Sequence, residues 1–250
     1  MYLFLGEPDD ALSRNVRQAL EKRGGRVRAL LHPFSESTRF SWRLDSSHSS
    51  SVIVFEDGTS IADNGISGIF LRQRNAAGIS DTGSADHSYI QAEIEAALLG
   101  WIWSLPCPVI NRLPAWLWYC PKPPFQFWAR LLRINGLLEV DCYRQESEAQ
   151  IANQDPSIVC GRACVIDQAV VWSDARPGKL ARCEPALIEF TRCTGLSLLE
   201  IVIVKTSDRI GVKEVDPFPD LSRFCSSSGA AITEALVKLF TDSNRPLGSQ

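Results

Sequence analysis

The hydrophobic positions of this 250-residue chain change their period repeatedly, and each change predicts an element. An apolar run at residues 2–5 predicts a strand. Apolar residues at helical spacing between Ala11 and Arg23 predict a helix that ends at Gly24-Gly25. The segment from Arg26 to Leu31 predicts a second strand. The order strand, helix, strand indicates two parallel strands joined by a helical crossover.

The remainder of the chain continues as a mixture of strands and helices. A Ser- and Thr-rich stretch, Ser35 to Ser51, predicts a loop or an edge hairpin. Further single strands are predicted at 51–55, around 61, and at 66–71, 109–111 and 137–143. Residues 158–172 predict a pair of strands that turns at Asp167-Gln168. Residues 198–204 predict a strand whose hairpin partner begins after residue 211. Further helices are predicted at 88–103, 125–134, 183–193 and 229–240. The pattern is that of an α/β protein.

Composition and charge exclude several classes of protein. Hydrophobic residues make up 45% and charged residues 22% of the chain, as in ordinary globular proteins, and the net charge of −3 favours neither nucleic acid nor an anionic membrane as a partner. The apolar region from Ala96 to Val109 is broken by Gly100, Pro106 and Pro108, so it does not predict a membrane-spanning helix. The N-terminal apolar run is too short for a signal peptide, and we expect a cytoplasmic protein.

Eight cysteines and three histidines offer no recognisable zinc site. The chain contains no Cys-x-x-Cys pair, and the histidines lie far apart in sequence. Structural zinc sites favour tighter spacings, so we expect reduced, mostly buried thiols. The sequence also lacks a Gly-x-Ser-x-Gly elbow, a Walker A motif and a dinucleotide-binding fingerprint.

Two carboxylates on a strand near the C-terminus form a candidate metal site. Glu214 and Asp216 follow an apolar strand and a turn, and Pro217 stops their own strand. Side chains two apart on a strand point the same way, so both carboxylates can converge on one Mg²⁺ ion. The alternative is a solvated hairpin that ends in a Pro-rich turn.

Arginines at strand ends form a candidate substrate site. Arg72 and Arg74 lie at the carboxyl end of the strand predicted at 66–71, where α/β folds usually bind ligands. Alternation places both on one face, where they could clamp a carboxylate or phosphate, and Arg112 at another strand end could join them. The alternative is that these arginines pair with local acids.

A dense aromatic segment offers a candidate partner surface. Adjacent residues such as Trp116, Trp118 and Tyr119, with Phe125 nearby, cannot all face one core. Exposed aromatic groups often mark interfaces, so we expect a protein partner or a second copy of the chain here. The alternative is that these residues are core.

Several passages, taken in order, resemble the ATP-grasp superfamily. They are "LFLGEPDD" near the N-terminus, "GIFLRQRN" at residues 68–75, the passage from Cys107 to Val140, and "GLSLLEIVIVKTSDRIGVKEVDPFPDL" from Gly195 to Leu221. The resemblance is to the branch whose ligases couple carboxylates to amines on peptides and proteins. It implies a pre-ATP-grasp-like α/β domain at 1–112, with a parallel sheet and helices, a reduced ATP-grasp-like α+β domain at 113–240, and a flexible tail at 241–250.

The resemblance also implies roles for individual residues. Lys122 would contact phosphate, Glu214 would bind Mg²⁺, and Asp216 would replace the Asn ligand of the family. Such a ligase makes an acyl phosphate from ATP and a carboxylate and then lets an amine attack it. The protein must mainly neutralise charge and align the reactants.

Departures from the family pattern lead to competing hypotheses. Between Tyr143 and Ile158 there is neither a lysine nor a glycine, so most of the central ATP-binding lobe is expected to be missing. Around Ile201 to Val204, where another acidic ligand is expected, the residues are apolar and Glu200 is the nearby acid. We therefore expect a degenerate accessory or binding protein in which Mg-ATP binding is weak or lost. The alternatives are a working ligase, completed by another chain, and an unrelated α/β binding protein.

Overall fold

The structure, a computed structural model, describes most of the chain in two compact units. The described residues are 1–7, 9–31, 33, 38–46, 49–72, 85–120, 124, 126–139, 159–173, 178–205 and 210–242. Unit 1 comprises Met1–Pro121 with Val237–Gln250, and unit 2 comprises Lys122–Leu236. The division between these units falls after Pro121, and the domain boundary expected from the sequence, after Arg112, stays a prediction. Residues 241–242 complete a helix, and the rest of the predicted tail lies outside the described residues.

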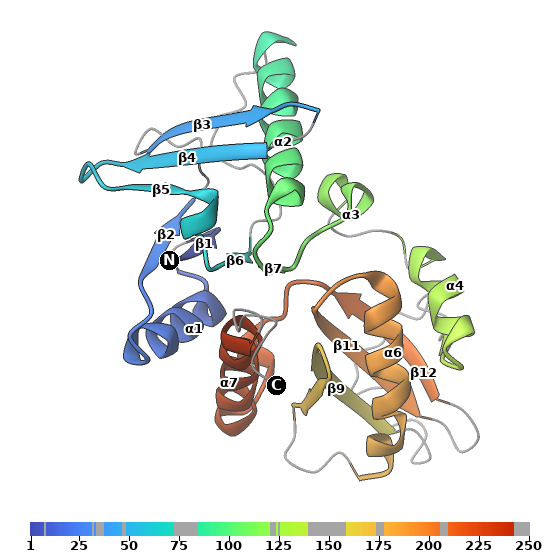
Figure 1. Cartoon of the computed structure of the whole chain (residues 1–250). Coiled ribbons are helices and arrows are strands. Elements are labelled where there is room, and N and C mark those ends of the chain that lie inside the picture. Colours follow the sequence, from blue (N-terminus) through green and yellow to red (C-terminus); the bar gives the residue numbers. More distant parts are fainter. Residues whose placement is uncertain are drawn as a thin grey trace. The chain divides into compact units, whose positions relative to one another are not determined.

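A parallel sheet forms the centre of unit 1 (Figure 1). Its strands are β1 (Tyr2–Leu5), β2 (Val27–Leu30), β6 (Gly68–Leu71) and β7 (Val109–Ile110), in the order β2-β1-β6-β7. The crossover from β1 to β2 is α1 (Ala11–Lys22), which buries Leu12, Val16 and Leu20. The chain leaves β1 toward one edge and returns at β6 on the other side, which creates a topological switch point between β1 and β6.

An antiparallel sheet and a long helix complete the N-terminal part of unit 1. The strands are β3 (Thr38–Leu44), β4 (Ser49–Phe55) and β5 (Ser60–Ala62), followed by the short helix η1 (Asp63–Gly65). The helix α2 (Ala85–Ser104) lies beside this sheet (Figure 1), and the Trp101 indole N–H donates a 2.8 Å hydrogen bond to Ser51 Oγ. Of the two forms expected for the Ser- and Thr-rich stretch, the hairpin is present. A short helix, α3 (Ala115–Tyr119), follows β7.

The last turns of the C-terminal helix, α7 (Ser226–Asp242), belong to unit 1. The Phe240 ring lies 5.6 Å from the Tyr2 ring and 6.2 Å from the Phe70 ring, measured between centroids. A Cβ on Gly68 would lie 2.8 Å from the Phe240 ring, so this strand position suits glycine alone. The parallel sheet of unit 1 therefore packs against the last turns of α7, which belong to the same unit.

Unit 2 is built on a five-stranded sheet. The order is β10-β9-β11-β12-β8, and the pairs are antiparallel except for β12 with β8. The bounds are β8 (Leu138–Glu139), β9 (Val159–Ile166), β10 (Ala169–Trp172), β11 (Leu198–Lys205) and β12 (Ile210–Asp216). The helices are α4 (Gln126–Ile134), η2 (Gly178–Cys183), α6 (Glu184–Thr194), η3 (Leu221–Arg223) and the first part of α7.

One face of the unit 2 sheet packs against η2 and α6 (Figure 1). Trp172 donates a 2.7 Å hydrogen bond from its indole to Glu184 at the start of α6. A Cβ on Gly161 would lie 2.3 Å from Leu180 and 3.3 Å from Trp172, so Gly161 faces the same layer. Because side chains alternate along a strand, Arg162 faces the opposite side.

The mixed α/β fold class predicted from the sequence is confirmed. No helix in the described part of the chain is long and apolar enough to cross a membrane.

Candidate functional site

The two carboxylates predicted as metal ligands lie on the sheet face opposite α6. Val202 of β11 is in register with both Arg162 of β9 and Glu214 of β12, and Glu200 is in register with Asp216. Residues in register share a face, as do residues two apart on one strand. The pairing therefore gathers Arg162, Glu200, Glu214 and Asp216 on one polar face, which we call the hairpin site.

Glu200 is the buried centre of the hairpin site. Its side chain is 1% exposed, and Oε1 accepts hydrogen bonds from the guanidinium groups of Arg162 and of Arg223, the latter at 3.0 Å. Oε2 accepts the backbone N–H of Asp220 at 2.9 Å. Two cations and a backbone donor compensate the burial of this carboxylate, which would otherwise be strongly unfavourable.

Arg223, on η3, bridges Glu200 to the outer carboxylates. Its NH1 lies 3.7 Å from Oε1 of Glu214, and its Nε lies 3.8 Å from Oδ2 of Asp220. The hydrogen bond to Glu200 raises the pKa of Arg223 above its ordinary value, and the charges of Glu200, Glu214 and Asp220 act in the same direction. One guanidinium thus lies within 4 Å of three acids, Glu200, Glu214 and Asp220, which we call the carboxylate cluster.

The hairpin site has oxygen donors of the kind that Mg²⁺ prefers, but their arrangement does not fit the ion. Oδ1 of Asp216 accepts the backbone N–H of Phe218 at 2.8 Å, and Glu200 is held by two arginines. In the described part of the chain, no group of three or more His, Cys, Asp or Glu residues could hold a metal ion. Metal binding by Glu214 and Asp216 stays a prediction.

Arg72 lies where the sequence placed it, directly after β6 at the switch point of the parallel sheet. Its Nε and NH2 donate hydrogen bonds of 3.1 and 2.9 Å to the two carboxylate oxygens of Asp10, and its side chain is only 7% exposed. Asp10 also caps α1 by accepting the Ser13 N–H at 2.7 Å. The acid that pairs with this buried arginine is 62 residues away in sequence, and substrate binding by Arg72 stays a prediction.

Arg112 is engaged with backbone carbonyls beyond the end of α2. It donates to Leu105 O at 2.9 Å and Cys107 O at 3.0 Å, and its guanidinium lies 5.7 Å from the centre of the Trp103 ring. The two other residues predicted to bind substrate or phosphate, Arg74 and Lys122, lie outside the described residues. Arg72 and Arg112, the two described arginines of the prediction, thus contact different groups, and substrate binding by Arg74 and Arg112 stays a prediction.

The aromatic segment is partly core. Trp118 is 2% exposed, so its inclusion in a partner surface is wrong: α3 turns this side chain inward together with Leu117. Trp116 and Tyr119 are 38% and 56% exposed, as a partner surface would require. Phe125 lies outside the described residues.

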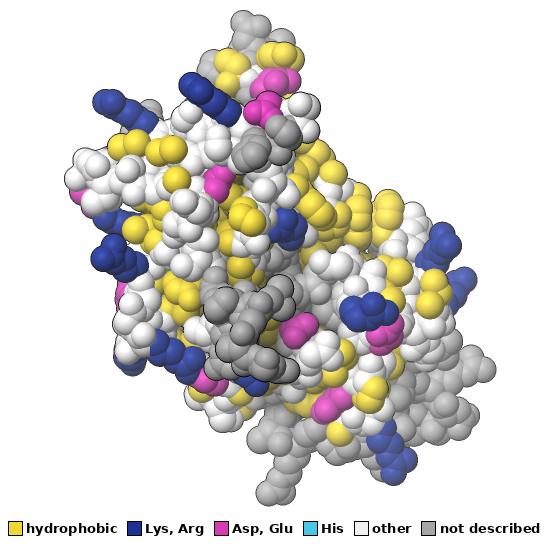
Figure 2. Space-filling view, viewed as in Figure 1, with side chains coloured by type: hydrophobic (Ala, Val, Ile, Leu, Met, Phe, Trp, Pro, Cys, Tyr) yellow, Lys and Arg dark blue, Asp and Glu magenta, His cyan; other side chains and the backbone are white. Residues whose placement is uncertain are grey.

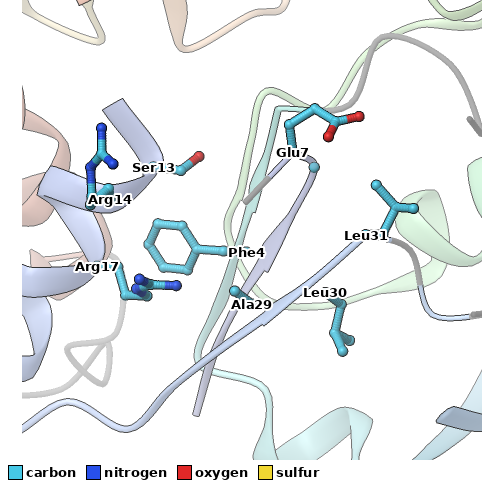
Figure 3. A pocket seen from close by; sticks show the side chains of 9 residues that line it. Phe4, Glu7, Ser13, Arg14, Arg17, Ala29, Leu30 and Leu31 are labelled. Atoms are coloured by element: carbon cyan, nitrogen blue, oxygen red, sulfur yellow. The ribbon is translucent and has the colours of Figure 1, made fainter. Parts of the chain in front are cut away.

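A small pocket opens between α1 and the ends of β1 and β2 (Figure 3). Phe4, Ala29 and Leu30 contribute apolar atoms, and Arg14, Arg17 and Glu7 contribute charged groups. Its volume is about 130 Å³, whereas pockets for drug-sized ligands measure about 300–1,000 Å³. This pocket is too small for a nucleotide.

Over the face drawn in Figure 2, the described Lys and Arg side chains are scattered among acidic ones and form no continuous basic track.

Sequence reasoning missed Arg162 and Arg223 and left Glu200 without a role. A signal for Arg162 was present: if the hairpins at 158–172 and 198–216 pair, alternation places Arg162 on the face of Glu200 and Glu214. Arg223 follows a Pro-rich turn in a three-residue helix, and no periodicity indicates where its side chain points.

Comparisons with known proteins identify the fold. No family model and no curated protein matches the chain. Among solved structures, the macrocyclase MdnC bound with precursor peptide MdnA from Microcystis aeruginosa matches with a TM-score of 0.72 and 14% identity, over 97% of this chain and 99% of that chain. A Chryseobacterium gregarium RiPP-associated ATP-grasp ligase, in complex with ADP and a leader and core peptide, matches with a TM-score of 0.71 and 11% identity, over 96% of each chain.

The ATP-grasp ligase PsnB complexed with minimal precursor matches with a TM-score of 0.67 and 13% identity, over 97% of this chain and 98% of that chain. These alignments extend over nearly the full length of the solved chains, so they give no support to the expected loss of the central lobe, which stays a prediction. At such low identity the structural likeness shows the fold alone: this chain has the fold of the ATP-grasp superfamily.

Proposed function

We propose that the chain is an ATP-dependent ligase that joins a carboxylate to an amine on a peptide. The observation that carries this proposal is the nearly full-length likeness to ATP-grasp ligases that were solved with precursor peptides, one of them also with ADP. The likeness favours a working ligase over the accessory role, because it extends over both units of the chain.

The proposed reaction proceeds through an acyl phosphate. A carboxylate oxygen attacks the γ-phosphorus of ATP and releases ADP, and an amine then attacks the acyl carbon and displaces phosphate. The protein contributes charge neutralisation and alignment. On the hairpin site, Arg162 and Arg223 are the described cations that could face anionic reactants, and Lys122 is a further proposed phosphate contact.

A peptide is the partner that we propose. The exposed aromatic side chains Trp116 and Tyr119 offer apolar surface on unit 1 that a peptide could cover. Replacement of both by alanine should weaken peptide binding while leaving nucleotide binding unchanged, because neither residue belongs to the hairpin site.

A degenerate accessory protein is the second candidate, and a specific observation favours it. Arg223 already occupies the centre of the carboxylate cluster, and the described donors do not form a metal site. Calorimetric titration with Mg·ATP, with Glu214→Ala as the control, separates the two candidates. Micromolar affinity that is lost in the variant supports the ligase. Absence of binding at millimolar nucleotide contradicts the ligase for this chain and supports the accessory role.

A further inference from the structure

The pocket between α1 and the ends of β1 and β2 has an apolar floor (Figure 3). Phe4 of β1 and Ala29 of β2 are paired in register, so their side chains share one face of the sheet. Leu30 and Leu31 continue the lining beyond Ala29. The Gly6 N–H donates a 3.0 Å hydrogen bond to Leu30 O, which ties the ends of the two strands together at the pocket.

Two arginines form the cationic wall of this pocket. Arg14 and Arg17 are three residues apart on α1, so they lie on one side of the helix, and Figure 3 shows both on the same side of the Phe4 ring. Arg14 is exposed and Arg17 is half-buried. Over the described part of the chain, neither guanidinium has an ion pair or a hydrogen bond, whereas Arg72 is held by Asp10.

The start of α1 does not itself provide the anion site. The backbone N–H of Ser13 already donates a 2.7 Å hydrogen bond to the Asp10 carboxylate, and the Arg14 N–H donates to Asp10 O. The two guanidinium groups are therefore the donors that this pocket offers to an anion.

The combination of an apolar floor and guanidinium groups favours a carboxylate on a short aliphatic body. Guanidinium matches a carboxylate with parallel N–H donors, and apolar walls favour an apolar ligand. A cavity of about 130 Å³ has room for several non-hydrogen atoms, since about 10–15 Å³ suffices for one water molecule. A phosphate ion would leave the apolar floor without an apolar partner.

Glu7 restricts the charge that the ligand can carry. It is exposed, and Figure 3 shows it on the other side of Phe4 from Arg14 and Arg17. A second negative group at that end of the ligand would be repelled by the Glu7 carboxylate. The lining therefore favours a ligand with one anionic end and one uncharged end.

We infer that this pocket is a binding site for a short aliphatic group that ends in a carboxylate. The guanidinium groups of Arg14 and Arg17 bind the carboxylate, and Phe4, Ala29 and Leu31 cover the aliphatic part. A free small acid and the C-terminal residue of a peptide both present this chemistry. The inference goes beyond the proposed ligase activity and does not depend on it, because no residue of the pocket belongs to the hairpin site.

Binding of 3-methylbutanoate in the absence of nucleotide tests the inference. Saturation-transfer NMR on the methyl protons of this acid measures its affinity for the full chain. Arg14→Gln and Arg17→Gln should each weaken binding about tenfold, because each removes a charge-assisted hydrogen bond. The matched control is Arg192→Gln, which removes the same charge from an exposed pair with Glu189 on α6 and should leave the affinity unchanged.

Two further ligands and one further variant separate the two parts of the site. The uncharged amide of the acid tests the arginines, inorganic phosphate tests the apolar floor, and each should bind at least about tenfold more weakly than the acid. Ala29 is exposed and lies on a strand, so Ala29→Val should fold normally while it fills the pocket and abolishes binding. Circular dichroism checks that each variant is folded.

Four results would overturn the inference. They are absence of binding by the unmodified chain, equal affinity for the acid and its amide, phosphate binding as tight as that of the acid, and unchanged affinity in Ala29→Val or in the Arg14→Gln/Arg17→Gln double variant. A short peptide that ends in valine with a free carboxylate identifies the source of the ligand. Tighter binding than the free acid assigns the site to a peptide C-terminus, and weaker binding assigns it to a small acid; both uphold the site.

Discussion

The guanidinium of Arg72 holds the carboxylate of Asp10 through two hydrogen bonds, 3.1 Å from Nε and 2.9 Å from NH2. The pair joins the end of β6 to the first turn of α1, which Asp10 caps. Replacement of Arg72 by Ala would leave a largely buried carboxylate without its cation, and we expect a loss of about 2–4 kcal/mol in the free energy of unfolding. Urea unfolding measures this loss. A change below about 0.5 kcal/mol would contradict a structural role for the pair.

The same pair predicts a pH dependence of stability. Burial raises the pKa of Asp10, but the hydrogen bonds and charge of Arg72 and the bonds from Ser13 outweigh it, so the pKa is lowered. A lowered carboxyl pKa stabilises the fold above the pKa of the unfolded chain, and this contribution is lost as pH falls through the folded value. Between about pH 5 and 3 the unmodified chain should lose more stability than Asp10→Asn. Parallel denaturation curves for the two proteins would contradict the prediction.

The hairpin site predicts an asymmetry between its two arginines. Arg162→Gln removes the buried partner of Glu200 and should cost about 2–4 kcal/mol of unfolding free energy. Arg223→Gln leaves Glu200 paired and should cost about 1 kcal/mol or less. The denaturant guanidinium chloride is a salt and would screen the ion pairs, so unfolding should be measured in urea. Equal losses would contradict the division of roles between the two residues.

Much of the fold follows from local patterns in the sequence. The turn at Asp167-Gln168 was predicted from two flanking apolar runs, and Asp167 indeed adopts a positive φ of 49° between β9 and β10. Asp10 and Gly195 mark the start of α1 and the end of α6, as their residue types indicate. These features depend on neighbours in sequence, which is why periodicity and capping residues predict them.

The candidate site depends instead on residues that are distant in sequence. Glu200 acquires its role because β9 brings Arg162 to one side and η3 brings Arg223 to the other. Arg72 was expected at a strand end and lies there, but its partner Asp10 is 62 residues away. Trp118 is buried although Trp116 and Tyr119 are exposed, because the five-residue helix α3 turns Leu117 and Trp118 inward. Such contacts depend on how the elements pack and on which strand residues pair, and the hydrophobic periodicity of the sequence determines neither.

Two glycines give a matched pair of packing predictions. A Cβ at Gly161 of β9 would lie 2.3 Å from Cδ1 of Leu180 on η2, so Gly161→Ala must displace the buried Leu180 side chain and should cost about 1–3 kcal/mol. A Cβ at Gly229 in α7 meets nothing closer than 3.9 Å, and Gly229→Ala should stabilise the protein by about 0.5–1 kcal/mol through helix propensity. The temperature of thermal unfolding should therefore fall in Gly161→Ala and rise in Gly229→Ala, and an unchanged or higher temperature in Gly161→Ala would contradict the packing of Gly161.

Cysteine reactivity offers a test at the start of α7. Cys225 is exposed, and its Sγ lies 3.2 Å from Ser227 Oγ and 3.1 Å from Ser228 Oγ. Hydrogen bonds from these two serines lower the pKa of Cys225 to about 7. Burial raises the pKa of Cys107 to about 11. The thiolate is the reactive form, so the alkylation rate of Cys225 should reach half its maximum near pH 7. Cys107 should stay unreactive in the folded protein.

Iodoacetamide labelling read by peptide mass spectrometry measures each cysteine separately. The Ser227→Ala variant removes the hydroxyl with the largest effect, so the midpoint for Cys225 should move to higher pH. Because the serine lies on the surface, the variant should leave the stability of the fold nearly unchanged, and a structural disturbance can be told apart from loss of the hydrogen bond. A midpoint for Cys225 that equals that of a free thiol, about 8.5, in both proteins would show that the serines do not stabilise the thiolate.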